Sequence, residues 1–417
     1  MLLDHTAGSV RAVRQPLLDV AAVSSFICAQ VPRMGGHEIV SLARARGRVA
    51  AADIAAPMAL PPFDHAAVDG YGLGAASLSA VATPIPVDRP IRAGDPPGGP
   101  VLGCVRILTG APVPPGMSAV VMQEHVERSG GAISLSQPVR PGANIRRVSE
   151  DVASGDVVVR AGQVLDVRHV ALLAALGLDE IAVARRPSVA IVALGNEIIE
   201  PGRPRADHQI YDSNSSMAAA FFERHGCEVR TIARVPDDPG RIEKALAAVA
   251  GTTNLLITSG GMADGDEDHT RTALTTLGGT WRTLGIKMKP GKPVALGEVS
   301  GTTVLGLPGN PFAALVGLVV VGLPILEALD GRNPLPPMVP ARSAFELDRL
   351  PGRAEFFPAC RLTAASGLTM IDRLGKGGSA RLSPLIEADA LGYIETSTGD
   401  IRRGSRLGYV PFENLFH

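Results

Sequence analysis

The residues best suited to chemistry lie in a series of short loops between residues 195 and 311. Most of these loops come directly after an apolar run that predicts a β-strand, and they combine glycines or prolines with amides, carboxylates or lysines. In chain order they are Gly195-Asn196-Glu197, Tyr211-Asp212-Ser213-Asn214, Pro236-Asp237-Asp238-Pro239, Ser259-Gly260-Gly261, Asp266-Glu267-Asp268, Lys289-Pro290-Gly291-Lys292-Pro293 and Leu307-Pro308-Gly309-Asn310-Pro311. Because open α/β sheets bind ligands at the carboxyl ends of their strands, we expect these groups to meet at one sheet edge.

The lysines of these loops suit a phosphate or another oxyanion. Lys289 and Lys292 would supply point charges, and the turn at Pro290–Gly291 would fix their spacing. Taken alone, the two lysines could be solvated surface side chains, because most lysines are exposed. The surrounding loops favour the binding role.

Two further loops offer backbone N–H groups to a phosphate. Ser259-Gly260-Gly261 ends a buried strand, where a glycine backbone can approach a ligand closely. Pro308-Gly309-Asn310 follows another apolar run in the same way. A Gly-Gly pair on its own is more often a simple turn, so the structural alternative stays open.

Composition narrows the class of protein. The chain has 417 residues, enough for two to four domains. A net charge of -1 and a pI near 6.8 argue against a general binder of nucleic acid or membrane surfaces. The four cysteines form no C-x-x-C motif, and the N-terminus lacks the apolar core of a signal peptide, so we expect a reducing cytoplasm.

The segment Phe312 to Leu326 imitates a membrane span. It is shorter than the roughly 20 apolar residues that a spanning helix needs, and it contains Pro324. We therefore expect a buried core helix.

The pattern of elements predicts four parts. Residues 1–55 and 150–186 would form one elongated domain, with helix predicted over 15–55. Residues 56–149 are rich in Pro and Gly with short β-like runs, which predicts an inserted β-rich domain. Residues 187–331 alternate strands with helices and so predict a mainly parallel sheet, and residues 332–417 predict a small β barrel or sandwich.

Helix signals in the α/β region are local and specific. Asp212 or Ser213 would cap a helix that ends at Gly226, and Asp238 would cap the helix that begins at Pro239. Asp238 could instead serve a ligand site, and the sequence does not separate the two functions.

The chain resembles the MoeA family, the molybdopterin molybdenumtransferases, whose eukaryotic relatives include the E domain of gephyrin. Motifs similar to those of the family follow one another in order along nearly the whole chain. Besides the loops above, they are Phe63 to Tyr71, Ile107 to Pro114, Val120 to Glu124, Ile145-Arg146-Arg147 with Glu150-Asp151, Gly352 to Phe356 and Ser379 to Ala390.

The resemblance implies a fold and a reaction. The fold is an elongated domain, an inserted β domain, a MogA-like α/β domain and a C-terminal β barrel. The reaction inserts molybdenum from molybdate into adenylated molybdopterin, with Mg²⁺ as cofactor and AMP as product. The family's homodimers place the active site between the α/β domain of one subunit and the inserted domain of the other.

The resemblance also implies roles for particular residues. Glu197 and Asp268 would hold Mg²⁺ at the pyrophosphate, as hard cations prefer carboxylates and phosphate oxygens. Asp69, Thr109 and Asp151 would act from the inserted side of the cleft, and Ser383 would contribute from the last domain. Each of these residues could instead have a purely structural role: Asp268 as a helix cap, Glu197 as part of a solvated loop, and Asp69, Thr109 and Asp151 as turn residues.

Departures from the family's pattern leave rival functions open. Asn196 stands where the family usually has Asp, and Ala263-Asp264 replaces a Ser-containing stretch. A non-catalytic carrier of molybdopterin or cofactor, a specialised paralogue and an unrelated nucleotide pyrophosphatase are the alternatives. Expected partners are a second copy of the chain, a MogA-type adenylyltransferase and recipient molybdoenzymes, with no nucleic acid and no membrane.

Overall fold

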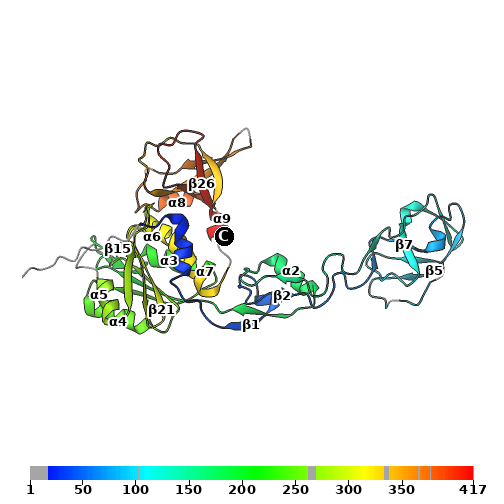
Figure 1. The fold of residues 1–417 in the computed structure, drawn as a ribbon, viewed down its shortest axis with the longest axis horizontal. Helices are drawn as coiled ribbons and strands as arrows, with labels where there is room; N and C mark the ends of the chain where they lie inside the picture. Colours follow the sequence, from blue (N-terminus) through cyan, green and yellow to red (C-terminus); the bar gives the residue numbers. More distant parts are fainter. Residues whose placement is uncertain are drawn as a thin grey trace, which may run out of the picture.

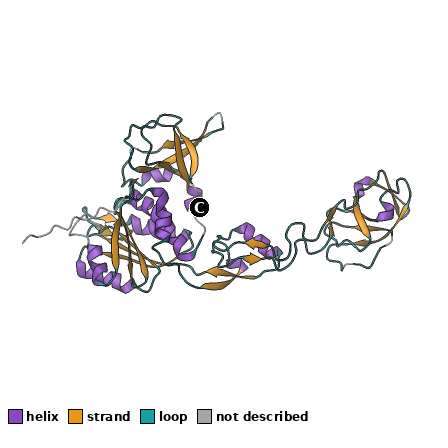
Figure 2. Ribbon diagram, in the orientation of Figure 1, coloured by secondary structure: helices purple, strands orange, loops and turns teal. Residues whose placement is uncertain are grey.

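The computed structural model describes residues 17–96, 98–101, 103–261, 269–332, 338–364, 367–375 and 377–416. The molecule is elongated: an α/β domain and a β barrel lie at one end, a slender middle part follows, and a separate β unit forms the other end (Figure 1). Figure 2 shows that helices gather around the α/β sheet, whereas strands dominate the barrel and the distant unit.

The α/β domain is built on a six-stranded sheet with the strand order β16-β13-β17-β21-β20-β18. The first four strands run parallel, β20 runs antiparallel to β21, and the edge strand β18 runs antiparallel to β20. The parallel pairings confirm the predicted mainly parallel sheet. Helices cover both faces of this sheet. The strands are β13 (Ser188–Leu194), β16 (Glu228–Val235), β17 (Leu255–Ser259), β18 (Thr280–Leu284), β20 (Val294–Val299) and β21 (Thr302–Leu307).

Two hydrophobic clusters pack on the two faces of this sheet. One cluster includes residues of α3 (Ser213–Arg224), α6 (Pro311–Gly317) and α7 (Leu323–Asp330), and the other includes residues of α4 (Pro239–Val249) and α5 (His269–Thr276). Every residue of β13 is buried, as expected for a central strand covered on both sides.

The predicted helix caps are present. Asp212 accepts a hydrogen bond from the N–H of Ser215 and so caps α3, and Gly226 follows that helix with φ +80°. Asp238 accepts from the N–H of Arg241 and caps α4. These ends form where the sequence predicts them because capping depends on neighbouring residues only.

The apolar segment is a buried core helix, as predicted. It runs through α6, a π-helical turn at Leu318–Gly322, and α7. The stretch Pro311–Asp330 is long and apolar enough to cross a membrane, but 83% of its most apolar window is buried inside the protein. The burial explains the composition without a membrane.

The prediction of helix over residues 15–55 is wrong for most of that stretch. Helix is limited to 3₁₀ turns at Val20–Ala22 and Leu42–Arg44 and to α1 (Val23–Cys28), which packs on α7. Between them β1 (His37–Ser41) pairs with β12 (Glu180–Ala184). The β-branched pair Ile39-Val40 suits this two-stranded ladder, and the partner strand lies too far along the chain for a local pattern to reveal it.

The rest of the slender middle part consists of short elements. Strand β2 (Ile54–Ala55) pairs with β11 (Val157–Val159). Strand β3 (His65–Ala66) pairs with β10 (Ile145–Arg146) where the middle part joins the β unit, because Ala66 and Ile145 are buried in a hydrophobic cluster of that unit. Helix α2 (Val167–Ala175) begins after the cap Asp166.

The distant β unit is a six-stranded sheet with the order β7-β4-β6-β5-β9-β8. It is inserted between the two halves of the slender part, so the predicted all-β insertion is confirmed. Its strands are β4 (Gly70–Gly74), β5 (Ile85–Ile91), β6 (Cys104–Ile107), β7 (Met117–Met122), β8 (Val126–Ser129) and β9 (Ala132–Leu135).

The C-terminal strands form a closed barrel, which decides between the predicted barrel and sandwich. The ring runs β23-β24-β22-β26-β25 and closes through the β23–β25 pairing. Strand β19 (Met288–Lys289) of the α/β domain adds to β23, which ties the two domains together. The barrel elements are β22 (Val339–Ser343), β23 (Ala354–Thr363), β24 (Thr369–Arg373), α8 (Ser383–Glu387), β25 (Ala390–Ile394), β26 (Arg406–Pro411) and α9 (Phe412–Phe416).

Candidate active site

Two loops at the carboxyl edge of the sheet are fastened to each other by Asn214. Its side chain projects from the first turn of α3, and Nδ2 donates to Ser259 Oγ at 2.8 Å and to the Gly309 carbonyl at 2.9 Å. The loops after β17 and β21 are therefore held in one arrangement. Asn214 belongs to a loop that the sequence singled out, but its bridging role depends on long-range contacts.

The Gly260-Gly261 turn is required by close packing. Both residues have positive φ, +83° and +66°. A Cβ on Gly260 would lie 2.4 Å from the Leu194 carbonyl oxygen, and one on Gly261 would lie 2.6 Å from Leu194 Cδ1. The N–H of Gly260 already donates to the Leu307 carbonyl, so it is engaged within the fold.

Asn196 joins the loops after β13 and β16. Its side-chain oxygen accepts from the N–H of Asp237 at 3.1 Å, and Asp237 Oδ2 accepts from the N–H of Asn196 at 3.3 Å. The side-chain part of this contact needs only an acceptor oxygen, which an Asp at this position would also supply. Beside it, the exposed Glu197 folds back over Gly195, where a Cβ would lie 2.7 Å from Glu197 Oε2.

Asp238 and Asp268, the other two predicted carboxylates of the α/β domain, differ in what the structure describes of them. Asp238 caps α4, and a further role toward a ligand stays a prediction. Asp268 lies outside the described residues, as do Ala263 and Asp264. Within the described part of the chain no group of three or more His, Cys, Asp or Glu residues could hold a metal ion.

Asp69 and Thr109 come together in the inserted β unit. Asp69 Oδ1 accepts from Thr109 N at 2.8 Å and from Thr109 Oγ1 at 2.7 Å. The backbone hydrogen bond from Thr109, followed by its hydroxyl, lowers the pKa of the Asp69 carboxyl. Asp69 directly precedes β4 and Thr109 follows β6. Within one chain, the β unit that contains these strands lies at the opposite end of the molecule from the α/β domain (Figure 1).

Asp151 lies in the slender part, along the chain between the β unit and the α/β domain. It is exposed, and its N–H donates to the Leu60 carbonyl at 3.1 Å. Asp151 lies on the segment between β10 and β11 and takes no part in the hydrogen bonds that join Asp69 to Thr109.

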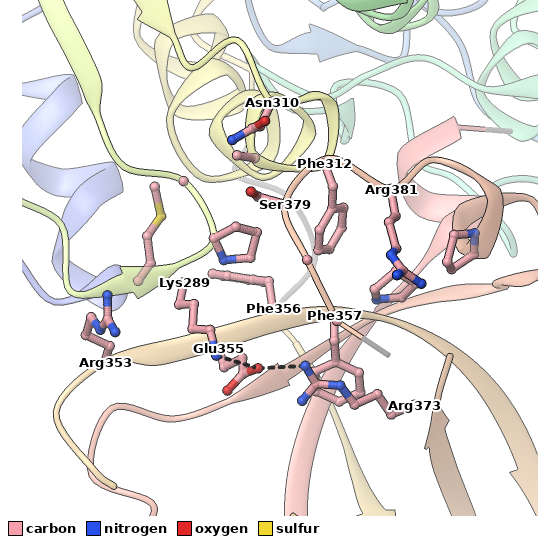
Figure 3. A pocket seen from close by; sticks show the side chains of 18 of the residues that line it. Lys289, Asn310, Phe312, Arg353, Glu355, Phe356, Phe357, Arg373, Ser379 and Arg381 are labelled. Carbon is pink, nitrogen blue, oxygen red and sulfur yellow. Dashed lines mark hydrogen bonds and ion pairs between the residues drawn. The ribbon is translucent and has the colours of Figure 1, made fainter. Parts of the chain in front are cut away.

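A cavity of about 620 Å³ lies where the α/β domain meets the barrel (Figure 3). Lys289, Lys292 and Asn310 reach it from the α/β domain. The barrel contributes four arginines that the sequence analysis did not single out as ligands: Arg349, Arg353, Arg373 and Arg381. Arg353 and Arg381 belong to two motifs similar to those of the family, and these motifs were the only sign in the sequence that the two arginines could serve the site. The packing of the barrel against the Lys289 loop could not be predicted from the sequence.

Two acidic side chains also line the cavity, Asp348 and Glu355. Asp348 is exposed and pairs with Arg402 at 2.8 Å. Six lysines and arginines outnumber these carboxylates, so the cavity carries an excess of positive charge. An anion is the ligand that this electrostatic environment favours.

Ser379, rather than the predicted Ser383, is among the described residues that line the cavity. The Ser379 carbonyl accepts hydrogen bonds from the N–H groups of Phe312 and Ala313, at 2.9 and 3.3 Å, and so fastens the barrel to α6. Ser383 is exposed at the start of α8, next to the cavity residue Pro384. A role for Ser383 stays a prediction.

Comparison with known proteins first gives the class of protein. The α/β part, residues 190–328, matches the model of a probable molybdopterin binding domain. Residues 18–177 match the MoeA N-terminal region (domain I and II), and residues 340–412 match the MoeA C-terminal region (domain IV).

Similar proteins then give the family. A molybdopterin molybdenumtransferase of Haemophilus influenzae is 33% identical over 406 residues, which cover 96% of this chain and all of that protein. Molybdopterin molybdenumtransferase 2 of Mycobacterium tuberculosis is 38% identical over 318 residues, 73% of this chain and 78% of that protein. A crystal structure of the molybdopterin biosynthesis MoeA protein of Pyrococcus horikoshii OT3 aligns with a TM-score of 0.81 and 28% identity, over 95% of this chain and all of that one. This chain belongs to the MoeA family, and the resemblance stated from its motifs is confirmed.

Proposed function

We propose that this chain inserts molybdenum from molybdate into adenylated molybdopterin and releases AMP. The cationic cavity beside the barrel carries the proposal, because it surrounds Lys289 and Lys292 with arginines from a second domain. Molybdate is a tetrahedral dianion, and the substrate carries phosphates. Guanidinium forks and lysine ammonium groups are the strongest protein partners for such oxygens.

The size of the cavity agrees with this substrate class. A volume of about 620 Å³ is within the range of small-molecule sites and exceeds what molybdate alone would fill. Phe312, Phe356 and Phe357 give part of the wall an apolar surface (Figure 3). We infer that the oxyanion binds among the cations and that the pterin side of the substrate contacts the remaining wall.

Mg²⁺ at the sheet edge would serve the cleavage of the pyrophosphate link. Glu197 is an exposed carboxylate at the end of β13, which suits an oxygen ligand, and Asp268 would supply the second. Bound there, Mg²⁺ would neutralise the phosphate oxygens and polarise the phosphorus. The chain's own residues would fix the geometry: Asn196 and Asp237 hold the Glu197 loop, and Asn214 holds the neighbouring loops.

We also propose a homodimer whose cleft is shared between subunits. Asp69 and Thr109 lie far from the sheet-edge loops within one chain, so only a second copy could bring them there (Figure 1). The slender part exposes large apolar side chains that a second copy could cover: Ile39 (58% exposed), Val167 (65%), Val164 (45%) and Val157 (40%). Sedimentation that shows a fully active monomer would contradict this proposal.

We place the reaction in the cytoplasm, where thiols stay reduced. The cysteines are free, and burial raises the pKa values of Cys104 and Cys227 to about 12, so these two thiols are poor nucleophiles. A MogA-type adenylyltransferase would supply the substrate, and recipient molybdoenzymes would accept the product.

The experiment that tests the proposed reaction measures AMP released from adenylated molybdopterin, with and without molybdate and Mg²⁺. We expect release only when both are present. A non-catalytic carrier would bind the substrate and release no AMP, and a simple pyrophosphatase would release AMP without molybdate. The carrier is the second candidate because Asn196, which bonds to Asp237, is a neutral amide where the family usually has Asp.

A further inference from the structure

A buried carboxylate lies in the wall of the cationic cavity. Glu355, on β23, is 5% exposed and lines the cavity (Figure 3). A charged side chain is rarely buried without partners, since desolvation is costly. A carboxylate is also the wrong charge for an oxyanion site, so its presence calls for an explanation beyond ligand binding.

The barrel itself holds Glu355 in place. Arg373 Nη2 donates to Glu355 Oε1 at 2.8 Å, and Arg349 Nε lies 3.8 Å from Oε2. The Arg349 side chain is only 8% exposed, and its guanidinium also donates to the carbonyls of Thr398 and Arg353. The carboxylate is therefore a fixed charge whose position does not depend on a ligand.

The third partner of Glu355 comes from the other domain. Lys289 Nζ lies 3.6 Å from Glu355 Oε1, and the Lys289 side chain is 57% exposed. The two residues are also opposite each other in the parallel β19–β23 pairing, so the backbone aligns them independently of the ion pair. Lys289 is thus the most exposed member of the cluster and the one that an incoming ligand can reach from solvent.

We propose that Glu355 is a positioning residue that holds Lys289 at the cavity wall and limits the affinity of the cavity for dianions. This inference rests on the proposed oxyanion function of the cavity. An incoming anion must share the Lys289 ammonium with Glu355 and is repelled by the carboxylate. The bound oxyanion consequently stays exchangeable and can pass to the next step instead of being trapped by six cations.

The electrostatic origin predicts a dependence on ligand charge. The energy between Glu355 and a bound anion is proportional to the charge of the anion. Removing the carboxylate charge should therefore strengthen binding of a dianion by the square of the factor gained by a monoanion of the same shape. A loss of structural support would instead weaken both.

The test measures binding of tungstate and perrhenate to Glu355→Gln by titration calorimetry. Both ions are tetrahedral oxyanions of similar size, with charges of two and one. Glutamine keeps the shape and can still accept a hydrogen bond from Arg373. We expect a gain in affinity of about tenfold for tungstate and about threefold for perrhenate, with tungstate released more slowly. Glu127→Gln, which removes an exposed carboxylate in the distant β unit, is the matched control and should change neither affinity.

Equal or weaker tungstate binding by Glu355→Gln would overturn the inference, and so would equal gains for the two anions. If the glutamine variant does not fold, Glu355→Asp replaces it: withdrawing the carboxylate from Lys289 should give a smaller gain with the same dependence on charge, and no gain overturns the proposal. If the parent protein binds neither anion, the proposed function of the cavity fails, and with it the basis of this inference.

Discussion

The loops at the sheet edge and the cavity beside the barrel differ in the groups that form them. The loops are backbone structures, shaped by glycines and fastened by short amide side chains such as Asn196 and Asn214. The cavity is formed by long cationic side chains that two domains contribute. A backbone loop fixes geometry closely but offers little charge, whereas flexible cations offer charge and need partners such as Glu355 to hold them.

From this contrast we infer a division of labour, in which the sheet-edge loops and the cavity serve different steps of the proposed reaction. The rigid loops with Glu197 suit the positioning of a metal and a scissile bond. The cationic cavity suits the capture and exchange of an oxyanion. Changes in the two regions should consequently affect different measurable steps.

The largest effect is expected for cleavage. Glu197→Gln keeps the shape of the side chain but removes a charge that would hold Mg²⁺, so AMP release should fall by at least about 100-fold, the loss of several kcal/mol of metal assistance. Tungstate binding in the cavity should stay unchanged. Asp207→Asn, an exposed carboxylate in a nearby loop, is the control for charge alone. AMP release at the parent rate in saturating Mg²⁺ would show that Glu197 is not a metal ligand.

Substitution of a glycine should destabilise the tightly packed Gly260 loop more than the neighbouring Gly309 loop. Gly260→Ala would place a Cβ 2.4 Å from the Leu194 carbonyl oxygen at a φ of +83°, so the free energy of unfolding should fall by about 3 kcal/mol. Gly309→Ala is the matched control, since its Cβ would meet nothing within 4 Å. Urea unfolding of both variants measures the difference. Equal stabilities would mean that the Gly260 turn relaxes without cost.

In the cavity, the expected loss is in binding. Lys292→Ala removes an exposed cation from the wall and should weaken tungstate binding by about 1.5–3 kcal/mol, the range for a charge-assisted hydrogen bond. Stability should change little. Lys244→Ala, an exposed lysine on α4, controls for net charge. Unchanged affinity in calorimetry would remove Lys292 from the oxyanion site.

The smallest effect concerns the inserted unit. Thr109→Val removes the hydroxyl that donates to Asp69, so the pKa of Asp69 should rise toward its ordinary value, which an NMR titration measures. The folded pKa of this carboxyl is depressed, so its contribution to stability is present above the unfolded pKa of about 3.9 and is lost as pH falls through the folded pKa. The variant should therefore be slightly less stable than the parent near neutral pH and equally stable in strong acid. A pKa that does not move would mean that the Thr109 N–H alone sets it.

Sequence reasoning succeeded where the determinants are local. The caps Asp212 and Asp238 and the helix stop at Gly226 depend on residues within a few positions, and all three are present in the structure. The parallel sheet followed from strands alternating with helices. The pattern of elements predicted the order of the four parts, and the resemblance to the family agreed with it.

The failures share a physical cause, which is distance along the chain. Strand β1 forms because β12, far away in the sequence, pairs with it, so a local pattern predicted helix instead. Arg349 and Arg373 reach the cavity only because β19 adds to the barrel strand β23. The bridging roles of Asn196 and Asn214 likewise depend on partners that the fold brings close.

The most direct test of the division of labour is AMP release measured over a range of molybdate concentrations in two variants. Lys292→Ala should regain the parent rate as molybdate rises, because its defect is the capture of the oxyanion. Glu197→Gln should stay slow at every molybdate concentration, because its defect is in cleavage. Recovery of both variants, or of neither, would contradict the assignment of separate steps to the loops and the cavity.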